Sequence, residues 1–208
     1  MEYLDWTIGK SSITSEYGDR IAVEGANSSS LDLSDKHKGS LEKLSKEISE
    51  LRGKILSRFT SIESDVDEII KLGLFKLDNL GDVSAKFDFL FLKAGIVEFS
   101  KKITLLKELA NNEPILKKFI TEENLKSLKK SMHSRNRFAH GNIVFINKDD
   151  DTFFPVIRYG QNELVEHKLD NGYFDKIFGY YKNSLDFLRK CYIESMQSFY
   201  ELLKSDKK

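Results

Sequence analysis

SMHSRNRFAHGNIVFI (residues 131–146) is the stretch in which the hydrophobic pattern of the chain changes from helical to extended. Up to Ala139 the apolar and polar residues follow the period of an α-helix, and Gly141 is typical of the position just after a helix ends. From Asn142 onward the period drops to two, which predicts a β-strand. The stretch therefore predicts a helix that is followed directly by a short β segment.

Three short strands are predicted after Gly141. The segments "NIVFI", "TFFPVIRY" and "LVEHKL" are read as strands, and turn residues separate them. The turn "KDDD" (residues 148–151) lacks the spaced oxygen ligands of a Ca²⁺ or Mg²⁺ loop, so we expect a solvated hairpin turn there. The three strands form a small antiparallel β insertion at about residues 142–169.

Long amphipathic helices are predicted on both sides of this insertion. From Leu41 to Ile69 the apolar residues recur at steps of three and four, and the later segments show similar stripes. The predicted helices cover residues 40–74, 85–110, 122–139 and 173–204, with a short helix at 114–120. We therefore expect an all-α fold, a bundle of about four main helices with the β insertion before the C-terminal helix.

The N-terminal segment differs in composition from the rest of the chain. Residues 1–38 are rich in Ser, Gly, Asp and Asn, which predicts a flexible polar N-terminal arm with at most one short strand, near Arg20 to Val23. A chain of 208 residues has room for one domain and such an arm. The expected organisation is thus an arm at 1–38 and a helical domain at 39–208.

Composition excludes several classes of function. The formal net charge is zero, so the whole chain is not a generic polyanion binder. One cysteine, Cys191, excludes an internal disulfide and a cysteine-based zinc site, and we expect it to fill space on a helix. No apolar run is long enough for a bilayer and no signal-peptide pattern occurs, so we expect a cytoplasmic protein without a membrane partner, metal or cofactor.

A local basic patch stands out on this neutral chain. Between Lys117 and His140 there are seven Lys and Arg residues and two Glu residues. The patch is either a solvated helix face or a surface for RNA. The candidate RNA-contacting residues are Lys126, Lys129, Lys130, His133, Arg137 and Lys102. For His133 and Lys102 an ordinary exposed position is the competing interpretation.

Arg135, Asn136 and His140 carry the chemistry of this patch. An imidazole can take and return a proton, a guanidinium can hold two phosphate oxygens, and an amide can fix the ring or the sugar. On a straight helix Arg135 lies about 140° from His140. Two arrangements could bring both to one phosphate: unwinding of the helix near Gly141, or a second copy of the chain across a two-fold axis.

The string "RNRFAHG" (residues 135–141) resembles the Arg-x4–6-His motif of the HEPN superfamily, the higher eukaryote and prokaryote nucleotide-binding domains. "FSKKITLLKEL" (residues 99–109) is similar to the preceding helix of many bacterial members, and the resemblance covers about residues 50–205. It implies a helical bundle, a symmetric dimer with both motifs facing a shared cleft, and metal-independent ribonuclease activity in a toxin–antitoxin or antiphage system. By position, Arg135 and His140 would be catalytic and Asn136 supporting.

The function expected from the sequence is a metal-independent endoribonuclease. It would cleave RNA by attack of the 2′-OH, leaving 2′,3′-cyclic phosphate and 5′-OH ends. Its expected partners are RNA, a second copy of the chain, and an antitoxin or other regulatory protein. Two alternatives stay open: a non-catalytic HEPN-fold module that binds RNA, a nucleotide or a partner, and a helical oligomerisation protein that uses the face from Leu41 to Ile55.

Overall fold

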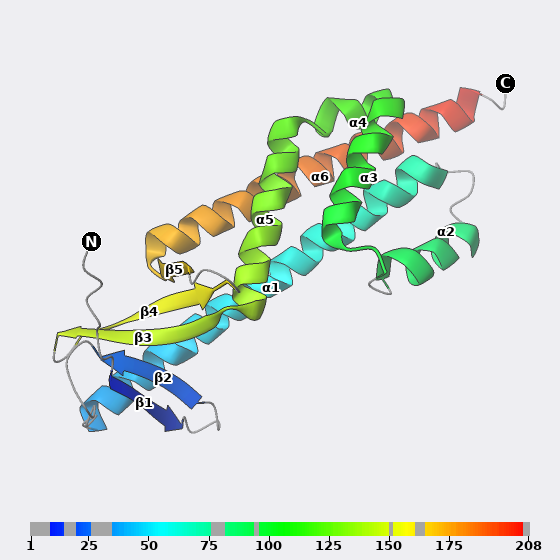
Figure 1. Ribbon diagram of the computed structural model, residues 1–208. Coiled ribbons are helices and arrows are strands. Elements are labelled where there is room, and N and C mark those ends of the chain that lie inside the picture. The colour runs from blue at the N-terminus through cyan, green and yellow to red at the C-terminus, as the bar shows by residue number, and fades with distance from the viewer. Residues whose placement is uncertain are drawn as a thin grey trace, which may run out of the picture. The chain divides into compact units, whose positions relative to one another are not determined.

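A computed structural model describes residues 9–14, 20–25, 35–75, 82–93, 96–149, 152–160 and 165–205. The helices are α1 (Asp35–Phe75), α2 (Asp82–Phe87), the π-helix η1 (Asp88–Lys93), α3 (Phe99–Asn112), α4 (Pro114–Phe119), α5 (Glu122–His140) and α6 (Asn171–Ser205). Figure 1 labels the six α-helices. The strands are β1 (Gly9–Thr14), β2 (Arg20–Gly25), β3 (Asn142–Asp149), β4 (Thr152–Tyr159) and β5 (Val165–Lys168). The described residues are mostly helical, and strands β3 to β5 precede the C-terminal helix. Both features were predicted.

The chain forms two compact units, and each unit is built from two separate segments of the sequence. The sheet unit contains residues 1–56 and 136–175, and the helical unit contains residues 57–135 and 176–208. Helices α1, α5 and α6 each contribute residues to both units. This division does not follow the expected boundary at residue 38, because a change in composition along the chain cannot show which distant segments pack together.

The sheet unit is organised around five strands in the order β1-β2-β3-β4-β5. Neighbouring strands are antiparallel, except that β2 and β3 run parallel, with Val23 opposite Phe145. The strand expected near Arg20 to Val23 is β2. Strand β1 was not predicted, because its sequence "GKSSIT" holds one large apolar residue, Ile13, and so shows no alternation.

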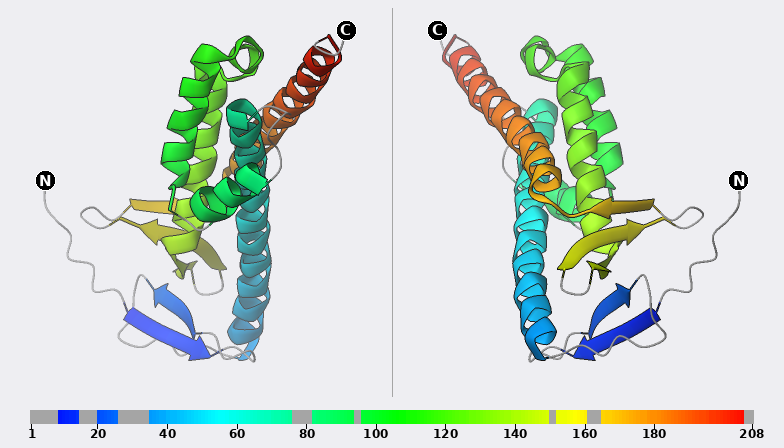
Figure 2. Two further views of the ribbon diagram at one scale, coloured as in Figure 1. Left: turned by 90° about the vertical axis from the view of Figure 1, so that its right-hand side faces the viewer. Right: turned by 90° about the vertical axis from the view of Figure 1, so that its left-hand side faces the viewer.

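The first half of α1 packs against this sheet. Leu41 on α1 and Phe145 on β3 are buried together, and partly buried apolar side chains pack around them: Leu44, Ile143 and Phe153. Both views of Figure 2 show the first half of α1 running beside the strands. Burial of this stripe against the sheet removes apolar surface from water, which stabilises the unit.

The apolar stripe of α1 is therefore used inside the chain. Leu41, Ile48 and Ile55 are 0%, 5% and 0% exposed. A face that is buried in its own chain cannot also join copies of the chain without rearrangement. The alternative that Leu41 to Ile55 forms an oligomerisation surface does not fit this structure.

The helical unit has its core between the long helices. Phe59 on α1 meets Phe99 on α3 edge to face, with ring centroids 4.8 Å apart, an arrangement that aromatic pairs favour. The aliphatic residues buried in this unit include Ile62, Val66, Ile69, Leu106, Leu116, Leu128 and Leu188. Of these, Ile62, Val66, Ile69 and Leu106 lie on the stripes that the sequence periodicity picks out.

Helices α5 and α6 meet through small hydroxyl side chains in the helical unit. Ser131 on α5 and Ser184 on α6 are buried, with their hydroxyl oxygens 3.1 Å apart. Ser184 also donates to the hydroxyl of Ser127, and Ser127 donates to the carbonyl oxygen of Tyr180 at 3.2 Å. These short side chains allow a close helix contact and satisfy one another's polar atoms away from water.

The second predicted helix is divided in the structure. Residues 85–110 were expected to form one helix, but they form the end of α2, the π-helix η1 and most of α3. Phe99, Ile103 and Leu106 are buried as expected, whereas Leu90 and Phe91 are 50% and 45% exposed. The reason is that "FDFLFLKAGIVEF" is apolar at nine of its thirteen positions, which fall on all sides of a helix, so its pattern does not indicate which face is buried.

Candidate functional site

Helix α5 is one continuous helix from Glu122 to His140. At its start the hydroxyl of Thr121 accepts a hydrogen bond from the backbone N–H of Asn124, as the predicted N-cap requires. At its end the N–H of Gly141 donates to the carbonyl oxygen of Arg137 at 2.6 Å, so helical bonding continues past His140. The helix does not unwind before His140, and unwinding therefore does not bring Arg135 and His140 together.

Gly141 is required by a close approach and not by a left-handed cap. Among the described glycines, Gly160 has a positive φ of 123°, whereas the φ of Gly141 is not in the left-handed region. A Cβ atom on Gly141 would press against the carbonyl oxygen of Arg137 and would lie 2.8 Å from Cγ1 of Ile157 on β4. The end of α5 thus lies against strand β4 with no room for a side chain, which fixes the position of the preceding His140.

The outer face of α5 carries the polar residues that were predicted to meet RNA. A helix turns by about 100° per residue, so residues three, four and seven apart from His133 lie within about 60° of it. The side chains on this face are Lys126, Lys129, Lys130, His133, Asn136 and His140, which are exposed, and Arg137, which is half-buried. The structure thus places His140 and Asn136 at the C-terminal end of a row of exposed basic side chains, which we call the α5 basic face.

Arg135 lies on the other side of α5. It is about 140° from His140 around the helix axis by the same rotation. Its side chain is half-buried, and its guanidinium carbon is 5.9 Å from the ring centroid of Phe59 in the helical unit. Within one chain the structure therefore does not bring Arg135 and His140 to a common point.

Arg137 belongs to an aromatic cluster in the sheet unit. Its guanidinium lies over the ring of Tyr159, 4.9 Å from the centroid. The hydroxyl of Tyr159 is 2.8 Å from Nε2 of His167, whose ring stacks on Tyr173. Burial raises the pKa of Tyr173, and the nearby Arg137 guanidinium offsets this rise only in part. The Tyr173 hydroxyl itself is buried and has no hydrogen-bond partner of good geometry among the described residues. Arg137 thus connects the end of α5 to this aromatic cluster and is half-buried there.

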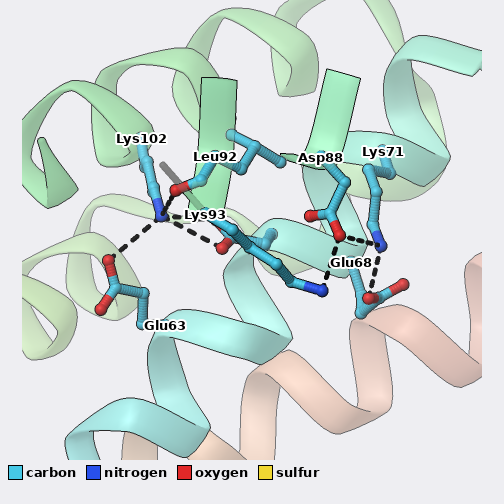
Figure 3. A network of polar contacts seen from close by, with 8 residues as sticks. Glu63, Glu68, Lys71, Asp88, Leu92, Lys93 and Lys102 are labelled. Carbon is cyan, nitrogen blue, oxygen red and sulfur yellow. Dashed lines mark hydrogen bonds and ion pairs between the residues drawn. The ribbon is translucent and has the colours of Figure 1, made fainter. Parts of the chain in front are cut away.

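Lys102 corrects the sequence-based interpretation. Neither a contact with RNA nor an ordinary surface position fits, because the side chain of Lys102 is 1% exposed. Its ammonium nitrogen lies 3.1 Å from an oxygen of Glu63, 2.9 Å from an oxygen of Asp67 and 3.1 Å from the carbonyl oxygen of Leu92 (Figure 3). Desolvation raises the pKa of Asp67, and the hydrogen bond and charge of Lys102 offset part of that rise. The two acids, Glu63 and Asp67, are one turn apart on α1, so both can reach the same ammonium group.

The same network holds the π-helix η1. Asp88 at the start of η1 is buried and lies 2.7 Å from the ammonium nitrogen of Lys93 and 3.7 Å from that of Lys71 (Figure 3). Lys71 comes from α1, so its ion pair with Asp88 connects the start of η1 to that helix. The pair of Lys93 with Asp88 lies within η1. A buried carboxylate needs such partners because it has left water.

Arg52 is a residue near the candidate site that the sequence did not indicate. It lies on α1, is half-buried, and donates a hydrogen bond from Nη2 to the carbonyl oxygen of Ala139 at 3.2 Å. Ala139 directly precedes His140. The two partners are 87 positions apart in sequence, and no motif links them, so a single sequence carries no signal for this contact.

Cys191 should react slowly with thiol reagents in the folded protein. Its side chain is buried, and burial raises the pKa of the thiol to about 11. At pH 8 only about one thiol in a thousand would be the reactive thiolate. Labelling with a colorimetric disulfide reagent should therefore be slow in buffer and fast in denaturant, and fast labelling of the native protein would contradict this burial.

The described residues were searched for membrane-spanning helices and metal-binding groups, and the chain was compared with known proteins. In the described ranges no helix combines the length and the apolar character that crossing a membrane requires. The same ranges contain no group of three or more His, Cys, Asp or Glu side chains arranged to hold a metal ion. Comparison of the chain with models of protein families, with curated proteins and with solved structures gave no match.

Proposed function

We propose that the chain is a metal-independent endoribonuclease of the HEPN type and that RNA binds along the α5 basic face. The observation that carries this proposal is the exposed pair of His140 and Asn136 at the end of a row of exposed lysines. The lysines supply the charge that attracts a phosphate backbone. The imidazole at the end of the row supplies a group that can accept and return a proton.

The proposed reaction uses the 2′-OH of the RNA itself as the nucleophile. His140 accepts the proton of this hydroxyl, whose oxygen attacks the adjacent phosphorus. The bond from phosphorus to the 5′ oxygen breaks, and the leaving oxygen takes a proton from solvent or from a second imidazole. The products are a 2′,3′-cyclic phosphate and a 5′-OH end. Asn136 lies one turn before His140 on the same face, where its amide can hold the sugar or the imidazole.

Arg135 enters this proposal through a second copy of the chain. Its position on α5, about 140° from His140, keeps it from the same phosphate within one chain. A two-fold arrangement of two α5 helices would let the guanidinium of one copy stabilise the phosphorane formed beside the imidazole of the other. The proposal therefore includes a homodimer with a composite cleft, and a protein antitoxin or other regulator that would limit its activity.

A second function is favoured by one specific observation. Arg135 is half-buried and lies near Phe59, while the lysines of α5 are exposed. This arrangement would suit a module that binds RNA without cleaving it. Such a module would lose affinity when Lys129 or Lys130 is replaced, and replacement of His140 would alter binding only slightly.

Replacement of His140 by alanine should lower the cleavage rate about 100-fold or more, the usual effect of removing a general base. His133→Ala, a change of the same residue type on the same face, should raise KM with little change in kcat. The measurement is cleavage of a labelled single-stranded RNA in excess EDTA, with the new ends identified by their chemistry. Equal cleavage by wild type and His140→Ala would reject the catalytic assignment. Tight binding by a wild type that does not cleave would instead support the binding module.

A further inference from the structure

We infer that Arg52 is a phosphate-binding residue that acts beside His140 in the proposed RNA site. The inference rests on the proposed function and adds to it a residue outside the Arg-x4–6-His string. It assigns Arg52 a contact with RNA in addition to its contact with the end of α5.

The geometry places the Arg52 guanidinium at the end of α5 that carries His140. Arg52 donates to the carbonyl oxygen of Ala139, the residue before His140, and all three belong to the sheet unit. The last carbonyl groups of an α-helix have no partner within the helix and point beyond its C-terminal end. A donor bound to one of them must lie at that end, within about one helical turn of the last residue, which is a rise of about 5.4 Å.

The guanidinium has donors left for a second acceptor. An arginine carries five N–H groups in a planar fork, and the bond to Ala139 uses one of them. Among the residues that the structure describes, no carboxylate forms an ion pair with Arg52. Its side chain is half-buried, so the position of the fork is constrained while part of it still meets solvent. A fork of this kind matches the oxygens of a phosphate.

Arg52 can supply the guanidinium that Arg135 cannot bring to His140 within one chain. Arg135 and His140 diverge because they lie on one helix, whereas Arg52 reaches the end of α5 from α1. A single chain therefore provides one imidazole and one guanidinium at the same helix end. With RNA bound, Arg52 would hold a phosphate next to the 2′-OH that His140 deprotonates.

The competing role for Arg52 is capping alone. A cation at a helix C-terminus stabilises the last carbonyl groups and the helix dipole. Capping alone predicts that removal of Arg52 lowers thermal stability and leaves RNA affinity unchanged. Binding of a phosphate predicts an additional change in the salt dependence of RNA affinity, because each neutralised phosphate releases counterions.

The test measures binding of a single-stranded RNA oligonucleotide by the full chain carrying His140→Ala, over a range of salt concentrations. Arg52→Gln should lower the affinity about tenfold at low salt and reduce the slope of log K against log salt by about 0.7. Lys54→Gln is the matched control, because Lys54 is an exposed residue two positions further on α1 and loses the same charge. Arg52→Lys should keep most of the slope, because it keeps the charge.

The outcomes distinguish phosphate binding by Arg52 from capping of α5 alone. An unchanged affinity and slope in Arg52→Gln, with a lowered melting temperature, would overturn the inference and leave capping as the role of Arg52. Equal losses in Arg52→Gln and Lys54→Gln would overturn it as well, since they would show a general effect of charge. A changed slope, together with no RNA cleavage by the chain that keeps His140, would support Arg52 as a phosphate ligand while rejecting the catalytic function. A wild type without affinity for RNA would reject both.

Discussion

Replacing Lys102 with methionine should lower the free energy of unfolding by about 3–5 kcal/mol at neutral pH, the range found when one partner of a buried ion pair is removed. The methionine has a similar volume, so the change removes the ammonium group with little loss of packing. It leaves Asp67, which is 4% exposed, as a carboxylate without its main cationic partner. Chemical denaturation of wild type and Lys102→Met measures this loss.

The size of this loss should depend on pH. The folded pKa of Asp67 is already raised above its ordinary value of 3.8 by desolvation. A raised folded pKa means that this carboxyl favours the folded state below pH 3.8 and that this contribution is lost as pH rises through the folded pKa. Lys102 lowers the pKa of Asp67, so its removal raises that pKa further. Lys102→Met should therefore be more destabilising at pH 7 than at pH 4, where Asp67 can take up a proton.

Two further variants test whether the loss in Lys102→Met comes from the unpaired buried carboxylate. Lys107→Met changes a lysine on the same helix α3, whose side chain is 53% exposed and pairs with Glu122. It should change stability little, because exposed ion pairs are screened by water. Combining Lys102→Met with Asp67→Leu should recover part of the loss, because no buried charge is then left alone. A Lys102→Met protein as stable as wild type at pH 7 would show that the ion pair contributes nothing.

Gly141→Ala should lower the free energy of unfolding by about 3 kcal/mol, the upper part of the usual range for overpacking. The added Cβ would meet the backbone carbonyl of Arg137 and the side chain of Ile157. A side chain can rotate away, but a carbonyl inside a helix cannot move without breaking its hydrogen bond. The end of α5 must then shift from β4, and His140 must move with it.

The matched comparison is the same substitution at an open glycine. Gly53 lies on α1, is exposed, and has no atom within 4 Å of the position that a Cβ would take. Gly53→Ala should stabilise the protein by about 0.5–1 kcal/mol, since alanine is the better helix former. Urea unfolding of both variants measures the difference. Equal stability of Gly141→Ala and wild type would show that the approach of α5 to β4 is looser than the structure has it.

Local patterns were sufficient to predict most helices and four of the five strands that the structure describes. The end of the helical pattern at Gly141 located the start of β3. The stripe from Leu41 to Ile69 determined α1, because a helix with one buried face repeats its apolar residues with a fixed period. The polar face of α5 was predictable for the same reason. So was the divergence of Arg135 from His140, which depends only on the rotation per residue.

Contacts between distant segments could not be read from these patterns. Lys102 finds Glu63 and Asp67 39 and 35 positions away, and nothing next to Lys102 in the sequence distinguishes it from a surface lysine. Arg52 meets Ala139 across 87 positions in the same way. The division of residues 85–110 into three elements was missed for a local reason. An apolar run with no single buried face fits several helical arrangements equally well.

The parallel pairing of β2 with β3 affects how this chain emerges from the ribosome. Val23 and Phe145 are about 120 residues apart in the sequence, and at about 5–20 residues per second their synthesis is separated by roughly 6–24 s. During that interval the second strand of the nascent hairpin has an open edge that can join other strands. Strand β3 can therefore cover the edge of β2 only after α1 to α5 have been synthesised.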